Sequence, residues 1–305
     1  MAEASPATRA QSELRTGVLF ALAAYGLWGV LPAYFKLIGS ISADVIVAHR
    51  VIWSMVFVGG YLAYQGRLRE ILAILRTPRL VGLLLCSALI IGGNWLVFVW
   101  AIGENRVLDI SLGYFINPLV SVVIGLVVLG ERLSRIQTIA VGLAIAAVMI
   151  KTVLFGGLPW VGLVLAVSFA AYGYLRKVTP VGATAGMLVE ILLLLPLAVL
   201  YIALVVPESV DPANLESPWL MPALAGAGLV TAVPLIFFSA AARRLPLVIM
   251  GLLQYLAPSL QFLQAVFVWG EPLDPAQLGT FAMIWAALAL VSAESWRRMR
   301  AGRGL

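Results

Sequence analysis

The chain has 305 residues, of which 62% are hydrophobic and only 11% are charged. Its mean hydropathy of +1.03 is far above that of soluble globular domains, so these values exclude an ordinary soluble protein. The net charge of +6 argues little for nucleic-acid binding, because the basic residues form short clusters between apolar runs. A single cysteine, Cys86, excludes a disulfide framework and a thiolate metal site.

Residues 1–15 are polar, and we expect them to form a mobile cytoplasmic leader. Ten apolar runs follow, each long enough to cross a hydrocarbon core of ~30 Å. They must be helices, because a lipid environment offers backbone groups no water to bond. The predicted spans are 16–37, 43–64, 80–102, 108–129, 136–154, 158–175, 183–206, 218–241, 246–269 and 276–296. The fold class is therefore an all-α polytopic membrane protein, ending in a basic cytoplasmic tail at 298–305.

The positive charges predict the orientation of these spans. Most of the 20 Lys and Arg residues lie in the termini and in the loops on one side of the arrangement. Cytoplasmic loops carry this excess in membrane proteins. We therefore expect both termini to be cytoplasmic in a multi-pass protein of the bacterial inner membrane.

One stretch of the chain occurs twice, at an offset of 140 residues. The stretches 112–137 and 252–277 share a mid-span proline, at Pro118 and Pro258, followed by a Gly-Glu pair and a glutamine in one register. This similarity indicates an internal duplication, with five-helix repeats at 16–154 and 155–297. Five is an odd number, so the two repeats should cross the membrane in opposite directions. Inverted repeats are typical of secondary transporters, whose substrates bind near the midplane.

Two ionisable residues lie deep within the predicted spans, where a charge costs ~2.5–3.5 kcal/mol at a helix centre. Arg50 and Glu190 are 140 residues apart and therefore occupy equivalent places in the two repeats. We expect them to face a shared cavity, where they either pair with each other or divide a zwitterionic ligand between them. The alternatives are a static salt bridge that fixes the helices and no contact at all. His49, beside Arg50, is a further candidate.

The prolines predict where helices bend. Pro118, Pro258 and Pro32 each remove a helix hydrogen bond at membrane depth, and irregular backbone persists there where it lines a cavity. Polar side chains near these prolines are candidate ligands for a small polar or aromatic solute, with interhelical bonding as the alternative. These candidates are Tyr114, Asn117, Gln254, Tyr255 and Asn94. We interpret Gln261 and Gln264 as packing contacts, and Glu131 and Glu271 as structural residues that close turns.

Several stretches also resemble a known family. They are AHRVIWS (48–54), NWLVFVWAI (94–102), SLGYFINPL (111–119), LGERLSRIQ (129–137), PLIFFSAAARRLPL (234–247) and GLLQYLAPSLQFL (251–263). From about residue 15 to 296 the chain resembles the EamA group of the drug/metabolite transporter superfamily, and within it the RarD permeases, named for a link with chloramphenicol sensitivity. The resemblance implies ten spans in two inverted five-helix repeats, and an inner-membrane permease that exports small metabolites, amino acids or drugs. It names no substrate.

Two classes of function remain to be compared. The favoured class is a secondary transporter that works by alternating access, with small-molecule solutes and membrane lipid as its partners. No GxxxxGK[ST] motif is present, so a gradient must drive transport; proton exchange and uniport both fit. The rival classes are an intramembrane enzyme and a receptor or scaffold. The chain lacks HExxH and GxSxG, and we expect no catalytic residues, metal or cofactor. The oligomeric state is not indicated.

Overall fold

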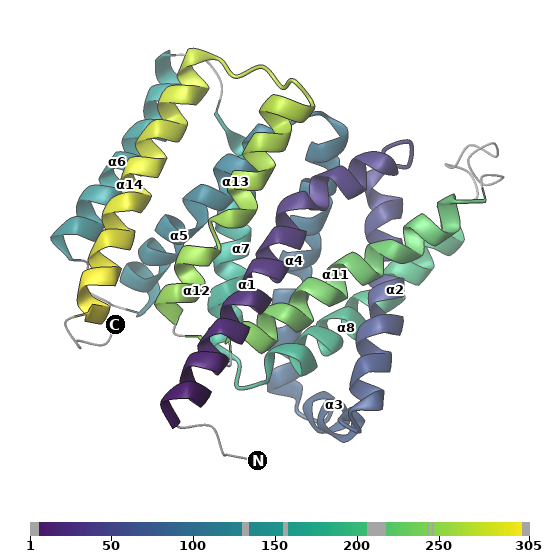
Figure 1. Ribbon diagram of the computed structural model, residues 1–305. Coiled ribbons are helices and arrows are strands. Elements are labelled where there is room, and N and C mark those ends of the chain that lie inside the picture. Colours follow the sequence, from purple (N-terminus) through teal and green to yellow (C-terminus); the bar gives the residue numbers. More distant parts are fainter. Residues whose placement is uncertain are drawn as a thin grey trace.

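The computed structural model describes residues 6–129, 134–154, 158–205, 218–242, 244–245 and 247–300, and this part of the chain contains helices and no strand. The long helices stand side by side in one bundle (Figure 1). The elements are α1 Pro6–Leu37, α2 Ala43–Tyr64, α3 Leu68–Leu75, α4 Pro78–Gly103, α5 Val107–Leu129, α6 Arg135–Leu154, α7 Trp160–Val178, α8 Ala183–Leu204, α11 Leu220–Ala242, α12 Leu247–Leu253, α13 Leu256–Leu263, the π-helix η1 Gln264–Val268 and α14 Pro275–Arg300.

Ten segments are long and apolar enough to cross a membrane, which confirms the ten predicted spans. The ends of the chain differ from the prediction. Helix α1 begins at Pro6, so much of the expected mobile leader is helical, and α14 continues to Arg300, into the expected tail. The sequence of both ends is polar, but a helix already formed by an apolar span extends through such residues without new nucleation.

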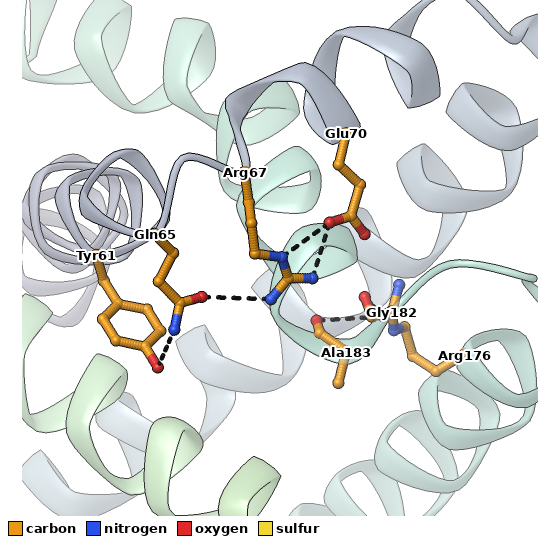
Figure 2. Close-up of polar contacts among 7 residues, drawn as sticks. All are labelled: Tyr61, Gln65, Arg67, Glu70, Arg176, Gly182 and Ala183. Atoms are coloured by element: carbon orange, nitrogen blue, oxygen red, sulfur yellow. Dashed lines mark hydrogen bonds and ion pairs between the residues drawn. The ribbon is translucent and has the colours of Figure 1, made fainter.

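The short helix α3, between α2 and α4, was not predicted. Its Ile71 and Ile74 are buried at a spacing of three residues, so one face packs against the bundle, where α3 contacts α4 and α8. At its start Arg67 donates to Glu70 Oε2 from Nε at 3.0 Å and from Nη2 at 2.8 Å (Figure 2). Eight residues cannot span a membrane, and the arginines in and around this segment make it look like a polar loop in the sequence.

The ninth span is broken, whereas its counterpart in the first half is continuous. The chain turns at Gln254 and Tyr255 between α12 and α13. Pro258 has no N–H to donate to the Gln254 carbonyl, which instead accepts from the Ala257 N–H at 3.4 Å. Helix α5 runs through the equivalent Pro118 without interruption. The single expected span at 246–269 is therefore divided into three helical segments.

The contacts between helices follow the expected duplication. Each membrane-spanning segment has a counterpart about 140 residues away: α1 and α7, α2 and α8, α4 and α11, α5 and α12–α13, α6 and α14. Three contacts have an equivalent between the counterpart helices: α5–α7 corresponds to α13–α1, α2–α11 to α8–α4, and α1–α11 to α7–α4. Three helices also contact their own counterparts directly: α2 contacts α8, α5 contacts α13 and α6 contacts α14. The opposite direction of the two repeats and their boundary at 154 stay predictions, which this pattern supports.

Helices α13 and η1 are bonded to α1 at the point where a proline removes a hydrogen bond from α1. Because Pro32 carries no N–H, the carbonyl of Trp28 has no partner within the helix. Gln261 Nε2 donates to this carbonyl at 3.2 Å, and Gln264 Nε2 donates to the next one, at Gly29, at 2.7 Å. Both glutamines therefore bond helices together, and Gln261 gives the Trp28 carbonyl a donor that lipid could not supply. Gln261 also lines the cavity between the two halves, so its interpretation as a packing contact alone stays a prediction.

Candidate functional site

A cavity of about 550 Å³ lies between helices of the two halves. At one end it is lined by Gly173, Ala183 and Ala242, which are exposed at the ends of α7, α8 and α11. At the other end its lining includes Leu31 and Phe98, which are buried. The cavity therefore opens at one end of the bundle, the end where the N-terminus of α1 and helix α3 also lie (Figure 1), and is closed at the other.

Arg50 lines the cavity from α2 and is only 5% exposed. Its Nε donates to Thr231 Oγ1 at 2.7 Å. The guanidinium carbon lies 4.2 Å from the centroid of the Trp95 ring and 5.7 Å from that of Phe35, which stabilises a buried cation through the ring faces. Nη1 is buried and has no hydrogen-bond partner, and within the described ranges no carboxylate forms an ion pair with Arg50.

Glu190 lines the same cavity from α8 and is 3% exposed. Its Oε1 accepts from Ser87 Oγ at 2.5 Å, and its Oε2 accepts from Tyr172 Oη at 3.2 Å. Arg176 Nη1 lies 3.6 Å from Oε1. Both oxygens of this carboxylate therefore have partners, and its charge is opposed by a guanidinium from α7.

Arg176 is held in place by backbone groups as well as by charge. Its Nη2 donates to the carbonyls of Gly182 and Ala183 at 3.2 and 3.3 Å (Figure 2). Those carbonyls belong to the start of α8, so Arg176 joins the end of α7 to the helix that carries Glu190. The ion pair is consequently a fixed part of the open end of the cavity.

Arg50 and Glu190 therefore share a cavity, but they make no ion pair with each other. Each has its own set of partners, Thr231 and Trp95 for Arg50, and Ser87 and Arg176 for Glu190. The expected direct pairing and the alternative of a static bridge between the two residues are both absent from this arrangement. Their roles in binding a solute stay predictions.

The structure brings most of the other candidates to the cavity: Tyr114, Asn117, Asn94, Gln254 and Pro258 line it. Two of them also bond helices together. Asn94 Nδ2 donates to Ser168 Oγ at 2.8 Å and to the Leu165 carbonyl at 3.2 Å, and Asn117 Nδ2 donates to the Ala166 carbonyl at 3.1 Å. These amides join α4 and α5 to α7, while the Asn94 Oδ1 is buried without a partner.

The remaining candidates, His49, Tyr255, Pro118 and Pro32, do not line the cavity. His49 is half-buried, and its Nδ1 has no hydrogen-bond partner. Adjacent residues of a helix point about 100° apart, so His49 lies on a different side of α2 from Arg50. The Tyr255 ring instead stacks on Phe115, with centroids 6.4 Å apart.

Several residues that matter to this site were not predicted. Thr231, Ser87 and Tyr172 are common residue types within apolar spans. The predicted span 158–175 ends one residue before Arg176, so this arginine belongs to a loop in the prediction. An aromatic wall, defined as Phe98, Tyr114, Phe169 and Tyr172, also lines the cavity. Successive ring centroids in the aromatic wall are 6.0, 5.8 and 6.1 Å apart. The position of Arg176 in the last turn of α7, level with the start of α8, was the available clue.

The closed end of the bundle is held by contacts between the halves. Glu271 Oε1 and Oε2 accept from the N–H groups of Val107 and Leu108 at 2.9 and 2.8 Å, where the start of α5 favours a negative charge. Lys36 Nζ lies 4.7 Å from the centroid of the Trp269 ring. Burial raises the pKa of the Glu271 carboxyl, although the two N–H groups act in the opposite direction. Glu131 lies outside the described residues.

Comparison with known proteins gives concordant results. A family model described as the EamA-like transporter family matches residues 15–153, which is close to the predicted first repeat. The chain is 46% identical over 278 residues to "Protein RarD" of Salmonella typhi, covering 91% of this chain and 95% of the relative. It is 43% identical to an "Uncharacterized transporter" of Vibrio cholerae, covering 96% and 97%. A solved structure titled "Crystal structure of protein" matches in fold, with a TM-score of 0.61 at 19% identity, over 93% of this chain and 98% of that one.

Proposed function

Because the chain belongs to the EamA-like transporter family, we propose that it is a secondary transporter of small metabolites, amino acids or drugs that works by alternating access in the bacterial inner membrane. The observation that carries this proposal is the cavity between the two halves, which opens at one end and is closed at the other. A volume of about 550 Å³ suits a small organic solute. Buried ionisable residues in a membrane commonly mark such a pathway.

The closed end supplies the contacts that must break for the solute to pass. Glu271 and Lys36 join the second half of the chain to the first at this end. In the proposed cycle these contacts separate while the open end closes around Arg176 and its ion pair with Glu190. The positive-inside pattern supports an open end that faces the cytoplasm, and in the proposed cycle this arrangement is the state that accepts a solute for export.

Flux into proteoliposomes tests this function directly. We would compare the wild type with Arg50→Ala and Glu190→Gln on a labelled panel of amino acids, metabolites and drugs, with and without a pH gradient. The matched control is Arg79→Gln, because Arg79 is exposed outside the cavity. We expect saturable flux of at least one solute, retained in the control and lost in both cavity variants.

The other outcomes are equally informative. Flux that is unaffected by the gradient identifies a uniporter, and flux that follows it identifies proton coupling. Undiminished flux in both cavity variants would remove Arg50 and Glu190 from the pathway. No protein-dependent flux of any solute would overturn transport in favour of a receptor or an enzyme.

A further inference from the structure

We propose that the solute is an organic anion whose carboxylate, or a similar planar oxyanion, binds the free Nη1 of Arg50 while its apolar body lies along the aromatic wall. The inference rests on the proposed transport function and names the substrate class of that same cavity. It differs from the zwitterionic ligand expected from the sequence, because Arg50 is without a counterion whereas the charge of Glu190 is opposed by Arg176.

The charge of the lining favours an anion. Its Arg, Lys, Asp and Glu residues are Arg50, Arg176 and Glu190; with all three charged, two guanidinium groups and one carboxylate leave one positive charge. Arg176 and Glu190 lie 3.6 Å apart and oppose each other. Arg50 is 5% exposed and has no such partner in the described part of the chain. A buried charge without a counterion is unfavourable, and an anionic solute removes that penalty.

The hydrogen bonds point the same way. Each oxygen of Glu190 already accepts one bond, from Ser87 or Tyr172, and Arg176 opposes its charge at 3.6 Å, so an amine would meet a carboxylate whose charge is already neutralised. Arg50 uses Nε for Thr231 and leaves Nη1 without a partner. The planar guanidinium matches a carboxylate in shape, and hydrogen bonds between charged groups are stronger than those between neutral groups. The unpartnered oxygens of the lining, on Asn94, Ser239 and Gln261, are neutral, so among the described residues of the lining the charged group left without a counterion is the Arg50 donor.

The aromatic wall defines the rest of the solute. At one end Phe98 packs against Phe35, with centroids 6.2 Å apart, and Phe35 itself lies beside Arg50. At the other end Tyr172 donates to Glu190. The wall thus leads from the free cation to the neutralised ion pair. A solute anchored by its acid at Arg50 would lay an apolar or aromatic body on these rings.

Equilibrium binding to the purified full chain in detergent tests the inference without requiring flux. The probes are 3-phenylpropanoate, 3-cyclohexylpropanoate, and the matching primary amides and primary amines, measured by calorimetry. We expect at least one acid to bind wild type about 10-fold to 100-fold more tightly than its amide, the range for a charge-assisted hydrogen bond. In Arg50→Gln this preference should fall to about twofold or less, and Arg79→Gln should keep it.

Arg50→Lys supplies a second measurement in case Arg50→Gln does not fold. Lysine keeps the charge but lacks the planar fork, so the preference for acids should decrease without disappearing. Three results would overturn the inference: no acid binds, an amide or amine binds as tightly as its acid, or Arg50→Gln keeps the full preference for acids. Flux of neutral or cationic solutes without any preference for acids would support the transport function and overturn only the proposed anionic substrate. Selective binding of acids without flux would support the anion site and overturn the transport function.

Discussion

Arg50 and Glu190 occupy equivalent positions in the two halves of the chain, yet their surroundings differ. Glu190 has a partner for each oxygen and an arginine 3.6 Å away. Arg50 has one hydrogen bond, two aromatic faces and a buried Nη1 without a partner. Each lies seven residues after the start of its helix, α2 or α8, as the predicted duplication requires. The neighbouring side chains, which diverge independently, decide whether each charge is neutralised or left available.

The largest test of this difference removes the partner of Glu190. Arg176→Gln would leave a buried carboxylate without its counterion, a change that costs about 3–5 kcal/mol for fully buried pairs. We expect about 2 kcal/mol here, because the Arg176 side chain is 13% exposed. Denaturant unfolding in detergent would measure the loss. The double variant Arg176→Gln with Glu190→Gln should recover part of the lost stability. Arg50→Gln should lower the stability less than Arg176→Gln does, because it leaves no buried carboxylate without a counterion.

A smaller effect is expected at the Arg50 end. Trp95→Leu keeps an apolar side chain but removes the ring face beneath the guanidinium, which should cost about 1–2 kcal/mol for a buried cation–π contact. The same substitution made in Arg50→Gln should cost clearly less, since no cation remains to be stabilised. Unfolding of the wild type, both single variants and the double variant gives the coupling energy. Equal losses in the two backgrounds would show that Trp95 acts only through packing.

The amide bonds between helices sharpen the comparison of the two halves. Gln261→Ala should lower the free energy of unfolding by about 1 kcal/mol, and by more than Asn117→Ala does. The Trp28 carbonyl, which accepts from Gln261, has no donor within its helix because Pro32 lacks an N–H. The Ala166 carbonyl, which accepts from Asn117, lies within the regular helix α7. Pro32→Ala restores that donor and should reduce the cost of Gln261→Ala. The measurement is again the free energy of unfolding. A cost that Pro32→Ala leaves unchanged would refute this account of the bond.

The smallest effect concerns Glu271, a carboxylate held by backbone groups instead of side chains. Burial raises its pKa above the ordinary value of 4.5, so the folded protein binds the proton more tightly than the unfolded chain does. The associated stability is fully present below the unfolded pKa and is lost as the pH rises through the folded one. The unfolding midpoint of the wild type relative to Glu271→Gln should therefore rise as the pH falls from 7 toward about 4.5.

The control for that measurement is Glu104→Gln, because Glu104 is exposed. Its difference from wild type should change little over the same pH range. The effect at Glu271 should remain below about 1 kcal/mol. A relative midpoint that falls with pH would show that the bonds to Val107 and Leu108 outweigh the burial of this carboxylate.

The ten spans and the two buried charges followed from the sequence because lipid constrains them strongly. A span needs a long apolar run, and Arg50 and Glu190 stand out against such runs. Their partners did not follow, because Thr231 and Ser87 come from distant spans and are common residues within them. The break before Pro258 could not be distinguished from the continuous helix at Pro118, since both prolines remove the same hydrogen bond.

The depth of the cavity has an electrical consequence. Arg50 lies seven residues from Ala43, the start of α2 at the closed end, or about 10 Å along a helix. Water entering from the open end thus reduces the insulating layer to about a third of the ~30 Å hydrocarbon core. The transmembrane voltage is focused across this thin layer, where a unit charge exchanges ~2.3 kcal/mol per 100 mV. A charged solute would reach Arg50 almost without crossing the field, and nearly all the voltage dependence of its transport would arise in the step past the closed end.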